Sequence, residues 1–487
     1  MHTNESNYTW QLENTYTSLP ADFYTLLRPV PVARPEIVFF NDCLAKDLGL
    51  GFLKHDKETI AGYFSGNEIP DGSDPLAQAY AGHQFGHFTM LGDGRAILLG
   101  EQVDPAGKRS DIQLKGSGRT PYSRRGDGRA TLYSMLREYL ISESMHHLGI
   151  PTTRSLAVVS TGEKVFREEI HEGAVLTRVA SSHIRVGTFE YARNFCSTED
   201  LEALTTYTIQ RHYPELSDTD NPYLELLKVV MHNQIDLIAN WMRVGFIHGV
   251  MNTDNMSIAG ETIDYGPCAF MNTYDPNTVF SSIDEHGRYA FSNQSSIAQW
   301  NLTVFANALL PIISENQQKA IQLAQEVIDG FEDTFTEKWY TMMFGKLGIS
   351  HPTDKDKVLV DELLSLIETN NADYTQAFLA LQQDKRSGTS LFKLEKFNHW
   401  LKKWEKAQLR GGSKASAFEL MNKHNPKVIP RNHWVEDVLK AAVIGDLAPF
   451  NQLLSMLSRP YDSHPDELKF QQIPEGFDAR YQTYCGT

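Results

Sequence analysis

The spacing of apolar residues predicts both strands and helices in the first half of the chain. Short apolar runs bounded by Gly and charged residues are typical of strands, and they occur at residues 96–101, 111–115 and 156–159. Between the last two runs, apolar side chains recur at nearly helical spacing at Leu132, Leu136, Leu140 and Met145. Gly149 and Pro151 then end a predicted helix over residues 131–148. The pattern predicts the order strand, strand, helix, strand.

The second half is mainly helical by the same criterion. An apolar stripe predicts a helix over residues 227–242, which ends at Gly245 and is followed by a loop at 248–255 and a strand at 256–264. Further helices are predicted at residues 297–313, 317–343, 357–368, 377–383 and 394–406. The last is rich in Lys and lies between breaker clusters at 384–390 and 410–413, so we interpret its basic side as a solvated face. The fold class is α+β.

Composition and charge narrow the class of protein. The 487 residues carry 45 basic and 61 acidic side chains, a formal net charge of −16. A field of that sign repels nucleic acid and anionic lipid, so we expect neither as a partner. The four cysteines do not form a disulfide scaffold. Residues 1–20 lack a targeting pattern, and no apolar run approaches the ~18 residues that cross a bilayer. These features indicate a soluble cytoplasmic protein.

The tetrapeptide Gly-Asp-Gly-Arg occurs twice, at residues 92–95 and 126–129. Glycines let backbone N–H groups approach an anion, and an adjacent Arg can bind phosphate oxygens with two donors. The first copy precedes a predicted strand, and the second precedes the predicted helix 131–148, whose N-terminus adds positive potential. Around the second copy lie four arginines, Arg119, Arg124, Arg125 and Arg129. A basic cluster in an acidic chain indicates a polyphosphate pocket, although either copy alone is also typical of a tight turn.

Lys115 and Glu138 have the character of a nucleotide-site pair. Lys115 ends a predicted strand, and Glu138 lies 23 residues later in the predicted helix. A glycine turn, a strand Lys and a helical Glu also occur in the N-terminal lobe of protein kinases. Arg137 and Glu138 are equally compatible with an exposed helical pair, so both interpretations stay open at this point.

The loop His248-Gly-Val-Met-Asn-Thr-Asp-Asn255 carries the strongest signal. Kinase-like enzymes have a catalytic Asp two residues after the His and a metal-binding Asn five residues further, and this chain keeps Asn255 but has Val250 at the Asp position. Asp264 follows nine residues after Asn255, within Ile-Asp-Tyr-Gly. Asn255 and Asp264 supply the hard oxygens that Mg²⁺ with ATP requires. Asp254 is the carboxylate left in the loop to accept a proton. Without a base at Val250, the protein either binds ATP silently or reacts at another phosphorus.

Eight motifs together resemble the selenoprotein O family. They are YAGHQFGH at 80–87, LGDGR at 91–95, DIQLKGSG at 111–118, SRRGDGR at 123–129, LTRVA at 176–180, HIRVGTF at 183–189, HGVMNTDN at 248–255 and IDYGP at 263–267. The resemblance covers residues 41–310 and resumes at 425–431 and at the C-terminus.

The resemblance implies a two-lobed protein-kinase-like fold that binds ATP in a flipped orientation and transfers AMP to Ser, Thr or Tyr hydroxyls of proteins, with UMP transfer in some members. The residues it implies for the nucleotide are Gly92, Gly94, Arg95, Lys115, Asp127, Gly128, Arg178, Arg185 and Asp264. It implies Asp254 as proton acceptor, Asn255 and Asp264 as ligands of Mg²⁺ or Mn²⁺, and Glu138 as the ion-pair partner of Lys115. It also implies a regulatory disulfide between Cys268 and Cys485. Cys485 stands at the position where some relatives carry selenocysteine.

Four regions follow from this resemblance and the pattern. We expect an N-terminal extension at 1–75, an N-lobe at 76–190, a C-lobe with the catalytic and metal loops at 191–300, and a helical region with the cysteine tail at 301–487. The alternatives to an AMP-transferring enzyme are a phosphate-transferring kinase and a catalytically silent ATP-binding scaffold.

Overall fold

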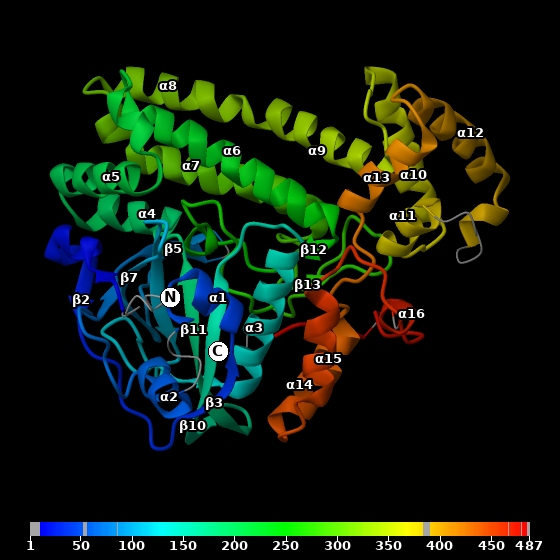
Figure 1. Ribbon diagram of the computed structural model, residues 1–487. Coiled ribbons are helices and arrows are strands. Elements are labelled where there is room, and N and C mark those ends of the chain that lie inside the picture. Colours follow the sequence, from blue (N-terminus) through cyan, green and yellow to red (C-terminus); the bar gives the residue numbers. More distant parts are fainter. Residues whose placement is uncertain are drawn as a thin grey trace, which may run out of the picture.

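A computed structural model describes residues 10–51, 56–84, 86–382, 390–465, 467–478 and 480–484 (Figure 1). Its largest sheet has nine strands in the order β2-β4-β7-β8-β11-β10-β3, with β1 on β7 and β9 on β11, and every pairing is antiparallel. The strands are β1 (Leu12–Glu13), β2 (Tyr24–Leu26), β3 (Glu36–Phe40), β4 (Leu76–Gln78), β7 (Ala96–Val103), β8 (Arg109–Lys115), β9 (Ala130–Thr131), β10 (Arg154–Phe166) and β11 (Ile170–Ala180).

The three predicted strands are confirmed as parts of β7, β8 and β10, whereas β11 was not predicted. The chain therefore has a mixed α/β fold with a large antiparallel sheet. Strands from the first 75 residues pair within this same sheet, because β3 pairs with β10 and β1 with β7.

Helices cover both faces of the sheet. Helix α3 (Leu132–His147) packs on β10 and β11, and its N-cap Thr131 accepts a hydrogen bond from the Ser134 backbone N–H. On the opposite face, α1 (Asp42–Asp47) and α2 (Lys57–Ser65) bury a small core that includes Ile112 and Leu114 of β8. Because side chains alternate along a strand, Gln113 and Lys115 point the other way, toward α3. This alternation places a lysine in the interior beside the helix.

A layer of long helices lies beyond one end of the sheet (Figure 1). It consists of α4 (Val186–Phe195), α5 (Thr198–His212), α6 (Pro222–Arg243), α7 (Gln294–Ile313), α8 (Gln317–Asp329) and α9 (Phe331–Leu347). Helix α6 packs on both α7 and α9. Among the described residues, one segment, Phe291–Ile313, is long and apolar enough to cross a membrane by length and composition, although the sequence pattern predicted no such run. Its contacts with α4, α6 and α8 are those of a core helix.

The C-terminal third is helical, as predicted. It contains α10 (Lys357–Thr369), α11 (Tyr374–Gln382), α12 (Glu395–Leu409), α13 (Lys414–His424), α14 (Asn432–Val443), α15 (Ala448–Leu457) and α16 (Glu467–Gln471). Helix α12 buries Trp400 and Trp404 and exposes its lysines, so the solvated basic face is confirmed. Helices α14 and α15 return to pack against α3, far from them in sequence.

Two local predictions were wrong. Residues 256–264 do not form a strand, because Ser257 and Thr262 each make one isolated bridge, to Arg185 and to Thr152, and no neighbouring residue continues either pairing into a ladder. The predicted helix 317–343 is divided at Gly330 into α8 and α9, and Asp333 and Glu332 favour the new N-terminus.

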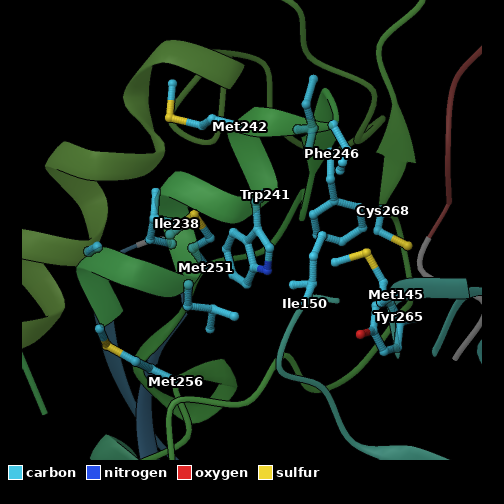
Figure 2. Close-up of a cluster of buried hydrophobic side chains, with 14 of the residues drawn as sticks. Met145, Ile150, Ile238, Trp241, Met242, Phe246, Met251, Met256, Tyr265 and Cys268 are labelled. Atoms are coloured by element: carbon cyan, nitrogen blue, oxygen red, sulfur yellow. The ribbon is translucent and has the colours of Figure 1, made fainter. Parts of the chain in front are cut away.

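A buried cluster fixes the segment that follows α6 (Figure 2). Trp241 and Phe246 pack edge to face, and the Trp241 Nε1–H donates to Thr262 Oγ1 at 2.8 Å. Strand β12 (Phe246–Ile247) pairs with β13 (Ala269–Phe270), which closes residues 248–268 into a loop. A second small hairpin, β5 (Ala81–Gln84) with β6 (His87–Met90), lies against this loop. The core therefore holds the loop that contains Asp254 and Asp264.

Candidate active site

A cavity of about 400 Å³ lies between the sheet, the N-terminal half of α3 and the loop 248–268. Twelve residues singled out from the sequence line it: Gly92, Gly94, Arg95, Lys115, Asp127, Gly128, Glu138, Arg178, Arg185, Asp254, Asn255 and Asp264. They come from segments separated by up to 172 positions, the distance from Gly92 to Asp264. The fold therefore brings every predicted nucleotide, catalytic and metal residue to one cavity.

Lys115 forms two ion pairs in the interior of this cavity. Its Nζ lies 2.6 Å from Glu138 Oε2 and 2.5 Å from Asp264 Oδ1, and the Lys115 and Glu138 side chains are 8% and 4% exposed. The predicted pairing of Glu138 with Lys115 is present in this geometry. The alternative of an exposed Arg137–Glu138 pair is wrong, since both residues are buried and Arg137 donates to the Cys268 carbonyl at 2.6 Å.

Two arginines converge with Lys115 on the carboxylate of Asp264. Arg178 Nη1 lies 2.7 Å from Asp264 Oδ1, and Arg185 Nη1 lies 3.3 Å from Oδ2. Burial raises the pKa of Asp264, but the three cations outweigh burial and hold that pKa well below its usual range. Asp264 also has a φ of 66°, a left-handed backbone conformation that costs energy for a residue with a side chain. Three cations therefore surround the carboxylate of a residue whose backbone is strained.

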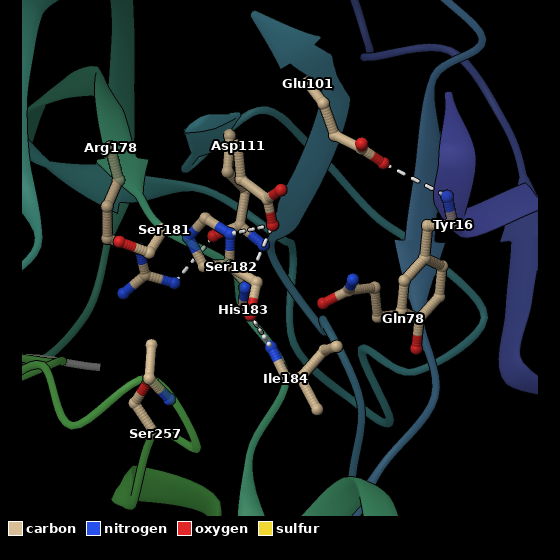
Figure 3. A network of polar contacts seen from close by, with 12 residues as sticks. Tyr16, Gln78, Glu101, Asp111, Arg178, Ser181, Ser182, His183, Ile184 and Ser257 are labelled. Carbon is tan, nitrogen blue, oxygen red and sulfur yellow. Dashed lines mark hydrogen bonds and ion pairs between the residues drawn. The ribbon is translucent and has the colours of Figure 1, made fainter. Parts of the chain in front are cut away.

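A polar network lies behind the cavity, and Figure 3 shows its part around Arg178, Asp111 and His183. Arg178 donates to Gln113 Oε1 at 2.6 Å, and Gln113 donates in turn to Asp93 Oδ2 at 3.1 Å. Asp111 accepts hydrogen bonds from the backbone and the ring of His183, both at 2.9 Å. Because His183 lies two positions before Arg185, these bonds set the direction in which Arg185 enters the cavity.

The first Gly-Asp-Gly-Arg loop closes the cavity on the sheet side. Gly92 has a φ of 124°, and a Cβ there would lie 2.4 Å from the Tyr122 ring, so only glycine fits. Asp93 between the glycines is buried, and its pKa is raised to about 6 by burial, against the opposing charge of Arg185. The Arg185 guanidinium also lies 4.5 Å from the centre of the Tyr80 ring.

The second Gly-Asp-Gly-Arg loop is more exposed than the first. Arg167 lies 2.8 Å from Asp127 Oδ2, and hydrogen bonds from Arg167 help to lower the pKa of Asp127. Arg129 donates to the Val30 and Pro31 carbonyls at 3.1 Å, so it is engaged in structure although it borders the cavity. Of the predicted arginine cluster, Arg124 and Arg129 line the cavity, whereas Arg119 and Arg125 are exposed outside it.

Asp254 lies in a short 3₁₀ turn, Thr253–Asn255, at the floor of the cavity. It is 9% exposed, and burial raises its pKa to about 7, although the charge of Arg185 opposes the shift. A carboxylate with a pKa near neutrality is suited to accept a proton. Val250 is also 9% exposed and lines the same cavity, so the position of the kinase base is apolar, as the sequence indicated.

The oxygens available for a divalent cation come from Asn255 and Asp264. Asn255 Nδ2 donates to the Val250 carbonyl at 3.0 Å, which fixes the amide and leaves its Oδ1 for a ligand. In the described part of the chain, no three His, Cys, Asp or Glu side chains form a metal-binding group. Mg²⁺ is commonly held by one or two protein oxygens together with substrate phosphates and water, so this donor set fits a cation that arrives with a nucleotide.

Cys268 is fully buried next to this site, and burial raises the pKa of its thiol to about 11. Cys485, its predicted disulfide partner, lies outside the described residues, so the disulfide stays a prediction. The last described residues approach the same place: Thr483 Oγ1 donates to the Pro267 carbonyl at 2.6 Å, and Tyr484 lines the cavity.

Several polar residues in and behind the cavity were given no role from the sequence, among them Tyr80, Asp93, Gln113 and Arg167. Asp93 and Tyr80 lie inside motifs of the family resemblance, but neither residue could be assigned a contact from the sequence. Gln113 lies two positions from Lys115 on β8, so alternation along the strand would have placed it on the same face. Arg167 reaches Asp127 from the turn between β10 and β11, and no spacing in the sequence indicates that contact.

The cavity thus holds three buried cations that are paired with the carboxylates of Asp264 and Glu138. Beside them lies Asp254, whose carboxylate is suited to accept a proton. Comparison with known proteins specifies the class. The family model described as protein adenylyltransferase SelO matches residues 6–458. Relatives described as protein nucleotidyltransferase YdiU from Brevibacillus brevis and Nitrosococcus oceani are 54% and 53% identical, over 98% of this chain and 98% and 97% of theirs. The chain belongs to the SelO family and is a nucleotidyltransferase.

Proposed function

We propose that this chain is a protein adenylyltransferase that transfers AMP from ATP to Ser, Thr or Tyr hydroxyls of other proteins and releases pyrophosphate. UTP is proposed as a second donor, from which UMP is transferred. The observation that carries the proposal is the convergence of Lys115, Arg178 and Arg185 on Asp264, in the cavity that also holds Asp254. The name of the family model and the names of the relatives support the same chemistry.

When ATP binds, the cations of the site would exchange their carboxylate partners for phosphate oxygens. In the structure Lys115, Arg178 and Arg185 form ion pairs with Asp264, and Lys115 also pairs with Glu138, so one positive charge of the cluster is not balanced by these two carboxylates. Phosphate oxygens would take over these cations, because charge-assisted contacts of Arg with phosphate are strong and bidentate. Gly92, Gly94, Arg95, Asp127 and Gly128 would complete the contacts with the nucleotide around the rim of the cavity. Asp264, released from the cations, would then be free to bind a divalent cation.

Mg²⁺ or Mn²⁺, held by Asn255 and Asp264, would supply charge neutralisation at the phosphates. The acceptor hydroxyl would lie at Asp254, which takes its proton. The hydroxyl oxygen forms a bond to the α-phosphorus, and the bond from that phosphorus to the oxygen bridging to the β-phosphorus breaks, so pyrophosphate leaves with the electron pair. Positioning and electrostatics would supply most of the rate.

The proposal extends to the fold, the regions, the partners and the location that the sequence predicted. We propose a kinase-like two-lobed fold with the N-lobe at 76–190 and the C-lobe at 191–300, preceded by an extension at 1–75 and followed by a helical region at 301–487. The proposed partners are ATP and hydroxyl-bearing proteins, without nucleic acid or membrane, in the cytoplasm. The net charge of −16 supports these partners, as does the packing of the half-buried apolar helix α7 on α4, α6 and α8.

The experiment that tests the proposal is label transfer from ATP to a protein acceptor, run in parallel with α-labelled and γ-labelled ATP and with Mg²⁺ or Mn²⁺. Asp264→Ala serves as the blank, because it removes the proposed metal ligand. Asp254→Asn keeps the shape of the side chain but removes the base, so we expect transfer to fall by about 10²–10⁴-fold while ATP still binds.

Covalent label from the α-position alone, lost in Asp264→Ala, is the expected result. Label from the γ-position alone would make the protein a kinase despite Val250. ATP binding without label in any form would favour the silent scaffold, and full transfer by Asp264→Ala would overturn the assignment of the site.

A further inference from the structure

The β5–β6 hairpin contains the motif at 80–87, to which the proposed chemistry gives no role. It is a two-stranded sheet separate from the large one, and β5 lies directly on the proposed base. The His83 N–H donates to Thr253 Oγ1 at 2.8 Å, and a Cβ placed on Gly82 would lie 2.4 Å from Asp254 Oδ1. Gln84, also on β5, lines the cavity. One strand of this hairpin therefore forms part of the wall beside Asp254.

The other strand, β6, has a free edge. Among the described strands it pairs with β5 alone, in the register Ala81 with Met90, Gly82 with Thr89 and His83 with Phe88. Facing pairs in an antiparallel ladder alternate between hydrogen-bonded and non-hydrogen-bonded. The Leu91 N–H donates to the Tyr80 carbonyl, so the next pair, Ala81 with Met90, is non-hydrogen-bonded. The same alternation makes His83 with Phe88 non-hydrogen-bonded, which agrees with the donation of the His83 N–H to Thr253.

The register has a direct consequence for β6. The backbone N–H and C=O groups of Phe88 and Met90 point away from β5, toward the outer edge of the hairpin. The side chains of the same two residues are 41% and 49% exposed. Phe88 stacks on Phe195 of α4, which is itself 50% exposed, with ring centres 6.1 Å apart. An exposed strand edge with apolar side chains is a template for pairing with another chain, and proteins usually cover or charge such edges.

We propose that the outer edge of β6 binds an extended segment of the acceptor protein as an added antiparallel or parallel strand, with apolar side chains of that segment on Phe88, Met90 and Phe195. The proposal rests on the proposed function, and it names the substrate class of that site: an apolar, strand-forming segment close to the modified hydroxyl. Main-chain hydrogen bonds would supply affinity, and the aromatic surface would select alternate side chains.

The position of the edge fits this occupant better than a lipid surface or a second copy of the chain. Strands in a sheet lie about 4.8 Å apart, so a segment on β6 would run about 10 Å from β5, which touches Asp254. Three residues beyond the docked segment span about 10 Å, and the acceptor side chain extends further, so its hydroxyl can reach the cavity beside Gln84. An acceptor must come this close to the base to react, whereas a lipid or a second copy has no such requirement.

The test uses a short synthetic peptide of alternating Val and Gln followed, three positions on, by one Tyr as its single hydroxyl, and a twin with Pro at alternate positions of the Val-Gln segment, which cannot pair as a strand. The full-length protein is assayed for α-label transfer to each peptide, and binding of the fluorescently labelled peptides is measured separately by anisotropy without ATP. We expect kcat/KM for the first peptide to exceed that for the twin by about tenfold, through KM more than kcat.

Two variants address the edge itself. Phe88→Ser removes the aromatic surface, and Met90→Pro removes an outward N–H without breaking a hydrogen bond to β5. Each is expected to lower kcat/KM for the first peptide by about tenfold, to weaken its binding, and to leave ATP affinity unchanged. The matched control is Leu409→Ser, since Leu409 is a 63% exposed apolar residue at the end of α12, and it should change neither quantity.

Equal kcat/KM for the two peptides, or wild-type values in both β6 variants, would overturn the docking proposal while the proposed function stands. Peptide binding that is strand-dependent and lost in the variants, without label transfer by any form of the protein, would keep the docking site and overturn the proposed function. If neither peptide binds and both are modified at the same rate, the acceptor docks elsewhere.

Discussion

Gly82 is the residue where the packing against the proposed base is tightest. An added Cβ would lie 2.4 Å from Asp254 Oδ1 and 2.9 Å from its Cγ, so an alanine there must displace the carboxylate or the hairpin. A displacement of about 1 Å in a catalytic group can cost about 10²-fold in rate. We therefore expect Gly82→Ala to lower kcat for AMP transfer by about that factor.

The measurement is single-turnover transfer at saturating ATP. Gly51→Ala is the matched control, because its nearest atom, Lys46 Cα, lies 3.8 Å away. Unchanged kcat in Gly82→Ala would mean that the hairpin moves away from Asp254 during turnover.

The raised pKa of Glu190 makes the free energy of unfolding depend on pH. It is buried on α4 and contacts the ring of His83; burial raises its pKa from 4.5 to about 7, while burial and Arg288 lower the pKa of His83. The folded state thus holds the carboxyl proton more tightly than the unfolded state. The resulting stability is fully present below pH 4.5 and is lost as the pH rises to about 7, an effect of up to about 3 kcal/mol.

Glu190→Gln removes this ionisation and keeps the shape of the side chain. We expect the variant to gain stability relative to wild type as the pH rises from about 4.5 to about 8. Urea denaturation across that range measures the difference, with the exposed Glu337→Gln as control. A difference that does not change with pH would show that Glu190 is ionised throughout.

At the scale of elements, Arg211 joins α5 to two strands of the sheet. Its side chain is 4% exposed and forms ion pairs with Glu101 of β7 and with Asp111 of β8, the second at 2.9 Å. Removing one partner of a buried network leaves uncompensated charge, at a cost of about 3–5 kcal/mol. Asp111 also accepts a hydrogen bond from His183, two positions before Arg185. Loss of the Arg211 ion pair would therefore also displace Arg185 in the cavity.

We expect Arg211→Met to lower the free energy of unfolding by about that amount and to weaken ATP binding. Guanidinium denaturation and ATP titration measure the two effects. Lys228→Met removes an exposed pair with Glu225 and should cost less than about 1 kcal/mol. Equal effects of the two substitutions would contradict a structural role for the buried network.

At the scale of the whole molecule, nucleotide binding links the sheet to the loop 248–268. A ligand at 100 times its Kd stabilises the folded state by about 2.7 kcal/mol, which for a chain of this length raises Tm by about 3 °C. We expect this shift with ATP and Mg²⁺ together and a smaller one without the metal. In Asp264→Ala the dependence on metal should disappear, and calorimetry tests it; a metal effect that persists would place the cation elsewhere.

The sequence by itself determined the local elements and the chemistry of the site. The strands at 96–101, 111–115 and 156–159, helix α3 and the loop around Asp254 follow from patterns of a few neighbouring residues, and short-range periodicity encodes such elements directly. Lys115 could be predicted as a phosphate-binding residue, and Asn255 and Asp264 as metal ligands, because each lies in a short motif of neighbouring residues. The motifs also identified the family, which the comparisons confirm.

Only the tertiary structure decided how these residues combine. Lys115, Arg178 and Arg185 meet at Asp264 because two strands, the start of α4 and the loop 248–268 bring them there, and no local spacing specifies that meeting. Because Glu138 is buried, it pairs with Lys115 and does not form an exposed pair with Arg137. Asp127 forms an ion pair with Arg167, which lies 40 positions away in the chain. Residues 256–264 do not form the predicted strand, because their backbone makes only isolated bridges to Thr152 and Arg185, which are distant in the chain. Long-range contacts and desolvation act between residues distant in the chain, and these decided the site.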